Sequence, residues 1–270
     1  MTVNLANVVV VLYQPQDVVN IGGVIRVMSN FGLSRLRLVE PAEYDPYRLE
    51  GIAHQGGLVI SKVEQYADLK SALADCGFVV GATARKRGLR RDCLTPAQVA
   101  PLTLKAAQTN TVALLFGRED SGLPNEALDD CHALITIPTD PANPSLNLAQ
   151  AALVVAYELW LAANDLQSPP VAVAAPLGQP PRGDELPSVA SAINLLGEAA
   201  RLATGTERET MFETLADLLR ALYPKTTDLQ VSYSMSRLRA VLLRAAPRDD
   251  ESRAISHLLR HIVQRLAKQD

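Results

Sequence analysis

The chain has 270 residues, 48% of them hydrophobic, which is enough to bury a core as one large domain or two smaller ones. Its formal net charge of −3 argues mildly against a nucleic-acid partner, although a local basic patch can outweigh the global balance. Its three cysteines are scattered without metal or disulfide spacing, and no apolar run is long enough to span a membrane. These features predict a cytoplasmic protein with reduced cysteines.

Strand-like and helix-like patterns alternate along the first 165 residues. Short runs rich in β-branched residues predict strands at Val8–Leu12, Leu36–Val39, Phe78–Val80, Thr111–Phe116 and Leu134–Ile137. Helical periodicity lies between these runs and includes Ile21–Phe31, Tyr66–Asp75 and Leu146–Ala163. Continuous apolar strands that alternate with helices predict an α/β domain whose parallel sheet is covered on both faces.

The last third of the chain has a different composition. Residues 166–187 contain six prolines and two glycines, so we interpret them as a linker. Beyond the linker only helical patterns follow, beginning at residues 206–223, where Thr206 and Glu209 are spaced as a capping box. The sequence therefore predicts a domain over residues 1–165 and a small all-helical domain over residues 188–270.

Polar residues gather at three places where an expected strand ends, and ligands of open α/β sheets bind beyond the carboxyl ends of strands. The first cluster contains Asn20, Gly22, Gly23 and Arg26. Helix capping explains Asn20 equally well, and close packing of a helix on the sheet explains the glycines. Arg26 is a lone charge in an apolar helical segment, so we expect it to need an anion or a partner.

The second cluster follows the strand that ends at Phe116. Gly117 and Gly122 permit backbone conformations that other residues avoid, and they leave backbone N–H groups accessible to a ligand. Arg118 and Glu119 lie between these glycines. They either fix a ligand or form an ordinary surface ion pair in a turn.

The third cluster precedes the long apolar helix. Three prolines over residues 138–144 stiffen a loop, Ser145 is a candidate N-cap, and Asn147 lies in the expected first turn. Capping alone explains Ser145 but leaves the prolines unexplained. A rigid loop ahead of a helix N-terminus is suited to holding a small ligand.

Several common functional motifs are missing from the chain. It has neither the dinucleotide-binding nor the P-loop glycine pattern, no hydrolase nucleophile elbow and no His/Cys spacing for a metal. Two stretches are basic: residues 85–91 carry five Lys or Arg in seven positions, and residues 231–270 carry eight against four acidic residues. Such stretches are either solvated or contact a phosphate-rich partner.

In this order and at these distances, the three clusters resemble the motifs of the SpoU (TrmH) family of SPOUT RNA methyltransferases. The pattern N-x-G-x-x-x-R is matched by Asn20, Gly22 and Arg26; F-G-x-E-x-x-G-L by Phe116, Gly117, Glu119, Gly122 and Leu123; and S-L-N-x-x-x-A by Ser145, Leu146, Asn147 and Ala151. The motifs span most of residues 7–160. The segment VVGATARKR and the helical extension resemble the branch of the family that 2′-O-methylates ribose at nucleotide 32 of the tRNA anticodon loop.

This resemblance implies a SPOUT fold whose α/β domain ends in a trefoil knot, and a homodimer with the active site at the dimer interface. It implies S-adenosylmethionine as cofactor, held at Ala82, Thr83, Ala84, Gly117, Ile137, Pro144, Ser145 and Leu146. It implies catalysis without a metal, on tRNA, by Asn20, Arg26, Glu119, Ser145 and Asn147. The candidate RNA contacts are Arg85, Lys86, Arg87, Arg90, Arg91 and Arg118, together with the C-terminal helices.

Within this pattern Arg26 is expected to orient a substrate phosphate and to stabilise the developing alkoxide, while Glu119 and Asn147 position Arg26 and the ribose. One alternative is a SpoU-type enzyme for ribosomal RNA or another tRNA position, because the motifs bind cofactor and ribose rather than the surrounding sequence. The alternative from another class is a non-catalytic RNA-binding protein with a SPOUT fold. The intact polar residues of the motifs argue against that class.

Overall fold

A computed structural model describes residues 5–84, 93–164 and 201–267. The first part of the chain forms a seven-stranded parallel sheet with the strand order β3-β2-β1-β6-β4-β7-β5. The strands are β1 (Val8–Tyr13), β2 (Arg35–Val39), β3 (Glu64–Tyr66), β4 (Cys76–Ala82), β5 (Cys93–Leu94), β6 (Thr111–Phe116) and β7 (Ala133–Ile135). The expected parallel sheet is confirmed, and the bounds expected for Thr111–Phe116 agree with those of β6.

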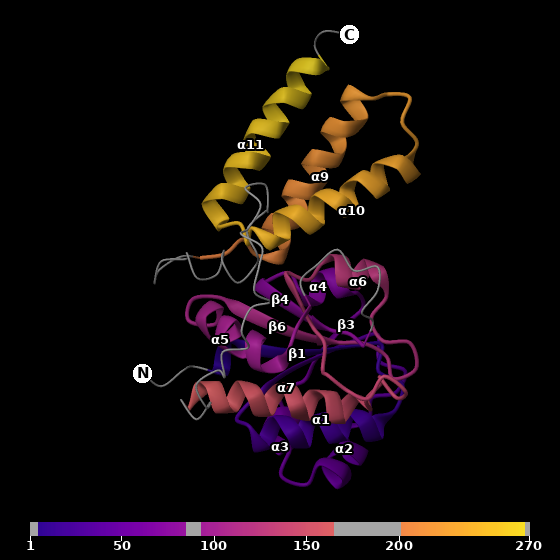
Figure 1. Cartoon of the computed structure of the whole chain (residues 1–270), viewed down its shortest axis with the longest axis vertical. Helices are drawn as coiled ribbons and strands as arrows, with labels where there is room; N and C mark the ends of the chain where they lie inside the picture. The colour runs from indigo at the N-terminus through magenta and orange to yellow at the C-terminus, as the bar shows by residue number, and fades with distance from the viewer. Residues whose placement is uncertain (1–4, 85–92, 165–200, 268–270) are drawn as a thin grey trace, which may run out of the picture.

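Helices cover both faces of this sheet, and the alternation of side chains along each strand explains why. Val8 and Val10 of β1 point into the core beneath one helical layer, whereas Val9 and Val11 point into the core on the other face. The first layer holds α1 (Val18–Asn30), α2 (Pro46–Ala53), α3 (Gly57–Ile60), α5 (Pro96–Ala106) and α7 (Leu148–Ala163). The opposite face carries the short helices α4 (Leu69–Ala72) and α6 (Asn125–Asp129), as Figure 1 shows.

Three expectations about helices of the first domain are wrong in detail. The expected helix Tyr66–Asp75 is instead the end of β3 followed by the short helix α4. α1 begins at Val18, because the Asp17 side chain accepts a hydrogen bond from the Val19 N–H and caps it; Asn20 is therefore not the N-cap. The N-cap of α7 is Asn147, whose Oδ1 accepts from the Ala149 N–H, so Ser145 lies in the preceding loop.

The C-terminal residues form a separate helical unit of α9 (Gly205–Leu222), α10 (Asp228–Arg244) and α11 (Asp249–Leu266). It has its own small apolar core, built from Met211, Phe212, Val231, Met235 and Leu243. No helix in residues 5–84, 93–164 or 201–267 combines the length and apolar character needed to cross a bilayer.

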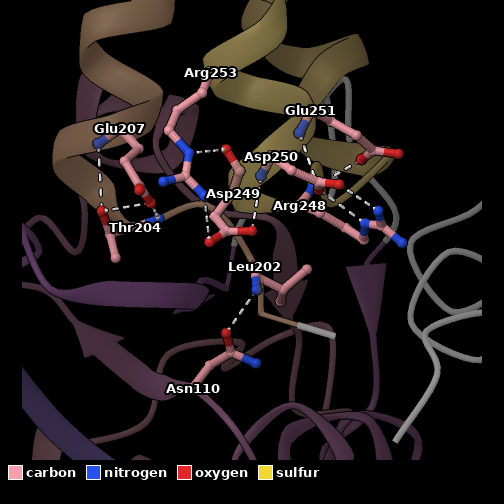
Figure 2. Close-up of polar contacts among 9 residues, drawn as sticks. All are labelled: Asn110, Leu202, Thr204, Glu207, Arg248, Asp249, Asp250, Glu251 and Arg253. Carbon is pink, nitrogen blue, oxygen red and sulfur yellow. Dashed lines mark hydrogen bonds and ion pairs between the residues drawn. The ribbon is translucent and has the colours of Figure 1, made fainter. Parts of the chain in front are cut away.

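Figure 2 shows how the chain enters the helical unit. The capping box of α9 is formed by Thr204 and Glu207 rather than by Thr206 and Glu209. Just before it, the Leu202 N–H donates to the Asn110 Oδ1 of the first domain over 2.7 Å. The entry of the helical unit is thus hydrogen-bonded to the end of the sheet opposite the carboxyl ends of its strands.

The helical unit rests on the face of the sheet that carries α4 and α6 (Figure 1). The buried Arg208 side chain donates from Nη1 to the carbonyl oxygens of Cys76 at 3.0 Å and of Gly77 at 3.3 Å. Gly205 lies so close to the first domain that a Cβ there would be 2.2 Å from the Leu73 carbonyl oxygen. The expected linker, residues 166–187, lies outside the described residues.

Candidate functional site

The ends of four strands bring the three polar clusters together. Leu12 of β1 pairs with Phe116 of β6, so the first and second clusters leave the sheet side by side. Ala82 of β4 pairs with Ile135 of β7, which brings the segment after β4 beside the loop that leads to the third cluster. Because all the strands are parallel, these segments share the carboxyl edge of the sheet, where ligands of open α/β folds bind.

A cavity of about 290 Å³ opens at this edge. All of the residues expected to hold a cofactor line it: Ala82, Thr83, Ala84, Gly117, Ile137, Pro144, Ser145 and Leu146. Phe116, Ile135 and Leu148 add apolar walls, while Glu119 and Asp120 add carboxylates. The cavity can therefore take an organic molecule that has both a flat apolar part and charged groups.

The second cluster forms a tight reversal of the chain at the cavity wall. Arg118 and Gly122 are bridged, with the Gly122 N–H donating to the Arg118 carbonyl oxygen over 2.9 Å. Gly122 has φ +68, in the left-handed region that favours glycine. A Cβ at Gly117 would lie 2.2 Å from the carbonyl carbon of Gly122. Both glycines are therefore required by the shape of this loop.

A chain of side-chain hydrogen bonds joins the three clusters. Asn20 Nδ2 donates to Glu119 Oε1 over 2.9 Å, and Asn147 Nδ2 donates to Asn20 Oδ1 over 2.8 Å. Glu119 also accepts from the backbone N–H of Gln16, at 3.0 Å from Oε2. The amide orientation of Asn20 is therefore fixed by a donor on one side and an acceptor on the other. We call Glu119, Asn20 and Asn147 the relay.

The glycines of the first cluster serve packing. A Cβ at Gly22 would lie 2.5 Å from Ile52 Cγ2 of α2, and one at Gly23 would lie 2.9 Å from Ala149 Cβ of α7. α1 and α7 run parallel, since Asn147 meets Asn20 at their starts and the ring of Phe31 meets that of Tyr157 near their ends, with centroids 6.1 Å apart. Close packing of α1 against α7 is what holds Asn20 beside Asn147.

Arg26 is exposed on α1 and contacts neither the relay nor any other described residue through a hydrogen bond or ion pair. Seven positions along a helix return to the same face, so Arg26 shares an outward face with Val19, which is 52% exposed. The charge that the sequence marked as needing a partner thus points away from the rest of its own subunit.

The remaining expected residues have simpler surroundings. Ser145 is exposed in the loop before α7 and lines the cavity. Arg118 is paired with Asp120, through Nε to Oδ1 at 3.0 Å and Nη2 to Oδ2 at 2.9 Å. Hydrogen bonds from Arg118 and Ser121 lower the pKa of the Asp120 carboxyl to about 2, so this carboxylate is a weak proton acceptor. The expected RNA contacts Arg85, Lys86, Arg87, Arg90 and Arg91 lie outside the described residues.

Sequence reasoning missed two contributions to the site. Gln16 holds Glu119 through a backbone N–H, which any residue type except proline would supply, so no side-chain signal exists for it. Asp120 is visible in the motif segment, but its bidentate pairing with Arg118 depends on the fold of the loop. Across the described ranges, no group of three or more His, Cys, Asp or Glu side chains is arranged to hold a metal ion.

Comparison with known proteins follows this geometry closely. Residues 7–157 match the SpoU rRNA Methylase family. The chain is 38% identical over 168 residues to the tRNA (cytidine/uridine-2′-O-)-methyltransferase TrmJ of Cronobacter sakazakii, which covers 61% of this chain and 69% of that protein. It is also 38% identical to TrmJ of Escherichia coli K12 over 164 residues, covering 60% of this chain and 67% of that protein.

A solved structure resembles the whole chain, including the helical unit. The crystal structure of TrmJ from Z. mobilis ZM4 has a TM-score of 0.74 and 28% identity, and the match covers 94% of this chain and 98% of that one. Since the family match spans more than half of the chain and takes in the relay and the cavity residues, this protein belongs to the SpoU rRNA Methylase family.

Proposed function

We propose that the chain is an S-adenosylmethionine-dependent tRNA 2′-O-ribose methyltransferase of the cytoplasm that acts on cytidine or uridine at nucleotide 32 of the anticodon loop. The observation that carries the proposal is the relay of Glu119, Asn20 and Asn147, which lies beside a cavity lined by the residues of all three motifs. The curated relatives named TrmJ support tRNA as the substrate.

The cavity residues fit S-adenosylmethionine by their chemistry. Phe116, Ile135 and Ile137 offer apolar contact to an adenine ring, and the carboxylates of Glu119 and Asp120 suit a sulfonium cation. A volume of about 290 Å³ lies at the lower end of the range of roughly 300–1,000 Å³ found for small-molecule sites. We further propose that the segment from β7 to α7 is threaded as the trefoil knot of this fold, with the cofactor held there.

The chemistry asked of the protein is modest, because S-adenosylmethionine supplies a methyl group already activated on a positively charged sulfur. The ribose 2′-hydroxyl must lose its proton and lie in line with that methyl group. Asn147 and Asn20, whose orientations are fixed through Glu119, are placed to bind the ribose. Arg26 carries a permanent positive charge, which suits it to orient a substrate phosphate and to stabilise the developing alkoxide.

The test of this function is methyl transfer from labelled S-adenosylmethionine to total RNA, followed by mapping of the modified nucleotide. Label on the ribose of nucleotide 32 of tRNA is expected. Label in ribosomal RNA, or at another tRNA nucleotide, would assign the protein to the rival reaction within the same family. Absence of calorimetric heat with S-adenosylmethionine, together with retained RNA binding, would assign it to the non-catalytic class.

A second copy of the chain is proposed to cover the outward face of α1 and α7. Leu153 and Tyr157 are i and i+4 on α7 and are 43% and 47% exposed, and Val19 and Arg26 lie on the neighbouring face of α1. An apolar face of this kind marks an interface between subunits. A homodimer formed there would put Arg26 at the boundary between the two subunits.

Tyr157→Glu is expected to convert the dimer to a monomer and to abolish methyl transfer, because the carboxylate would be buried without a partner. Light scattering at micromolar concentration measures the mass. Tyr47→Glu is the matched control, since Tyr47 lies on α2 and is 85% exposed. If Tyr157→Glu remained dimeric, or if the wild type were an active monomer, the interface would lie elsewhere.

We propose that residues 1–165 form the methyltransferase domain, that residues 166–187 link it to the second domain, and that the helical domain of residues 188–270 binds tRNA. Arg260 and Arg265 are exposed on α11 and suited to phosphates. Arg239 does not share this role, because its fork is committed to Glu209 and Asp130. The exposed Arg118 and the basic stretch at residues 85–91 are proposed to add further contacts.

The double variant Arg260→Gln, Arg265→Gln is expected to bind tRNA several-fold more weakly, with a salt dependence shallower by about one to two ions, while its affinity for S-adenosylmethionine stays unchanged. Filter binding over a range of salt concentrations measures both. Arg48→Gln is the control, since Arg48 is an exposed arginine of α2 that pairs with Glu43. Substitution is preferable to truncation, because removal of the helical unit would expose the apolar surface near Leu73. Equal affinity and equal salt slope would remove α11 from RNA binding.

A further inference from the structure

The wall of the cavity continues directly into α6. Residues 117–124 connect β6 to α6, and Leu123 anchors this connection by packing in the core beside Gly81 and Leu134. α6 itself has five residues and no side-chain hydrogen bond at its N-cap. So short a helix is not stable in isolation, so the position of α6 depends on what packs against it.

Two side chains of α10 bond to the end of α6 from the other unit of the protein. Ser236 Oγ donates to Asp129 Oδ2 over 2.9 Å, and Arg239 Nη1 donates to Asp130 Oδ1 over 3.0 Å. The helical unit therefore contacts the first domain at the far end of the segment whose beginning lines the cavity.

Arg239 is built into this contact from several sides. Its guanidinium makes two parallel bonds to Glu209 of α9, at 2.6 and 2.9 Å, and lies 4.3 Å from the ring centroid of Phe212. Its side chain is 21% exposed, against 19% for Glu209 and 34% for Asp130. Glu209 alone would neutralise Arg239, so the bond to Asp130 is an additional contact that crosses between the two units. A planar fork can hold both carboxylates, whereas a lysine ammonium cannot reproduce this geometry.

We infer that Arg239 is a positioning residue for the cofactor cavity: by joining Glu209 of α9 to Asp130 at the end of α6, it fixes the loop of residues 117–123. The inference rests on the proposed function, because the cavity is taken to bind S-adenosylmethionine. It gives the helical unit a role in cofactor binding that is separate from contact with RNA.

The experiment compares the full-length chain with Arg239→Lys, with Asp130→Ala and with the variant that carries both. Each single change is expected to raise the dissociation constant for S-adenosylmethionine, and its KM at saturating tRNA, about fivefold, with kcat nearly unchanged. The double variant is expected to be no worse than either single one, because both remove the same contact. Arg253→Lys is the control, since Arg253 pairs with Asp249 within α11.

A purely structural role would lower the thermal stability of the variants and leave the KM for S-adenosylmethionine unchanged, which would overturn the inference. Additive effects in the double variant would also overturn it. Should Arg239→Lys fail to fold, Asp130→Ala and Ser236→Ala test the same contact with the Arg239–Glu209 pair intact. If the wild type bound no S-adenosylmethionine, the proposed function would fail and this inference with it. Wild-type binding with unaltered variants would reject the positioning role alone.

Discussion

Arg26→Ala should reduce methyl transfer to tRNA by about 100-fold or more, while the affinity for S-adenosylmethionine stays within about twofold of the wild type. Arg26 does not line the cavity, so its removal leaves the cofactor contacts intact. It is exposed beside Val19 on the proposed subunit boundary, where its charge is available to a substrate phosphate. Single-turnover methylation and calorimetry measure the two quantities separately.

Two controls make the result on Arg26 specific. Arg26→Lys keeps the charge but loses the planar fork, so it should restore part of the activity lost in Arg26→Ala. Arg48→Ala removes another exposed arginine, one that pairs with Glu43, and should leave turnover unchanged. Light scattering must show that the Arg26 variants remain dimers. Near-normal turnover of dimeric Arg26→Ala would exclude Arg26 from the reaction.

Gly117→Ala should abolish cofactor binding, with an affinity for S-adenosylmethionine at least about 100-fold weaker. The added Cβ would lie 2.2 Å from the carbonyl carbon of Gly122 and 2.3 Å from the Leu123 nitrogen. Because these are backbone atoms, no side-chain rotation relieves the overlap and the cavity wall itself must move. Methyl transfer is expected to fall in parallel.

The matched control for this change is Gly51→Ala. A Cβ at Gly51 meets no atom within 4 Å, and the residue lies inside α2, where alanine is favoured over glycine by about 0.5–1 kcal/mol. Gly51→Ala should therefore bind cofactor normally and unfold at the same or a slightly higher temperature. Calorimetric binding by Gly117→Ala at wild-type affinity would contradict the geometry of the loop.

The sheet could be predicted from the sequence because its central strands are buried on both faces. Such strands appear as continuous apolar runs, and β6 is the clearest case. The edge strands β3 and β5 have three and two residues, too few to show any periodicity, so the sequence did not indicate them. β7 ends two residues earlier than expected, at Ile135, although the apolar run continues to Ile137; there the chain leaves the sheet and Ile137 lines the cavity.

The start of α9 shows why a local pattern can identify a helix and still misplace its first residue. In the sequence TGTERE, both Thr204 with Glu207 and Thr206 with Glu209 have the spacing of a capping box. The structure uses the first pair, and Glu209 instead binds Arg239. The close contact of Gly205 with the Leu73 carbonyl fixes where the helix begins, and that contact is invisible to local reasoning.

The candidate site was predictable to the extent that it follows from motifs at strand ends. Parallel strands carry those motifs to one edge, so the proximity of Asn20, Glu119 and Asn147 followed from the fold class. The destination of each arginine was not predictable. Arg26, Arg118 and Arg239 look alike in the sequence, yet one is exposed, one is paired within its loop and one joins two domains.

The anchoring of the helical unit also has a consequence for the order of folding. Arg208 reaches the Cys76 carbonyl across 132 positions of the chain, and Thr206 reaches Ala74 across the same separation. Contacts between such distant positions require the closure of a long loop, whose entropic cost must be met before the contact stabilises anything. β4 and its neighbours bring together residues much nearer in the chain, so we expect the sheet to form first. The surface around Leu73 is then the last apolar surface to be covered, and during synthesis it stays open to solvent until α9 has been made.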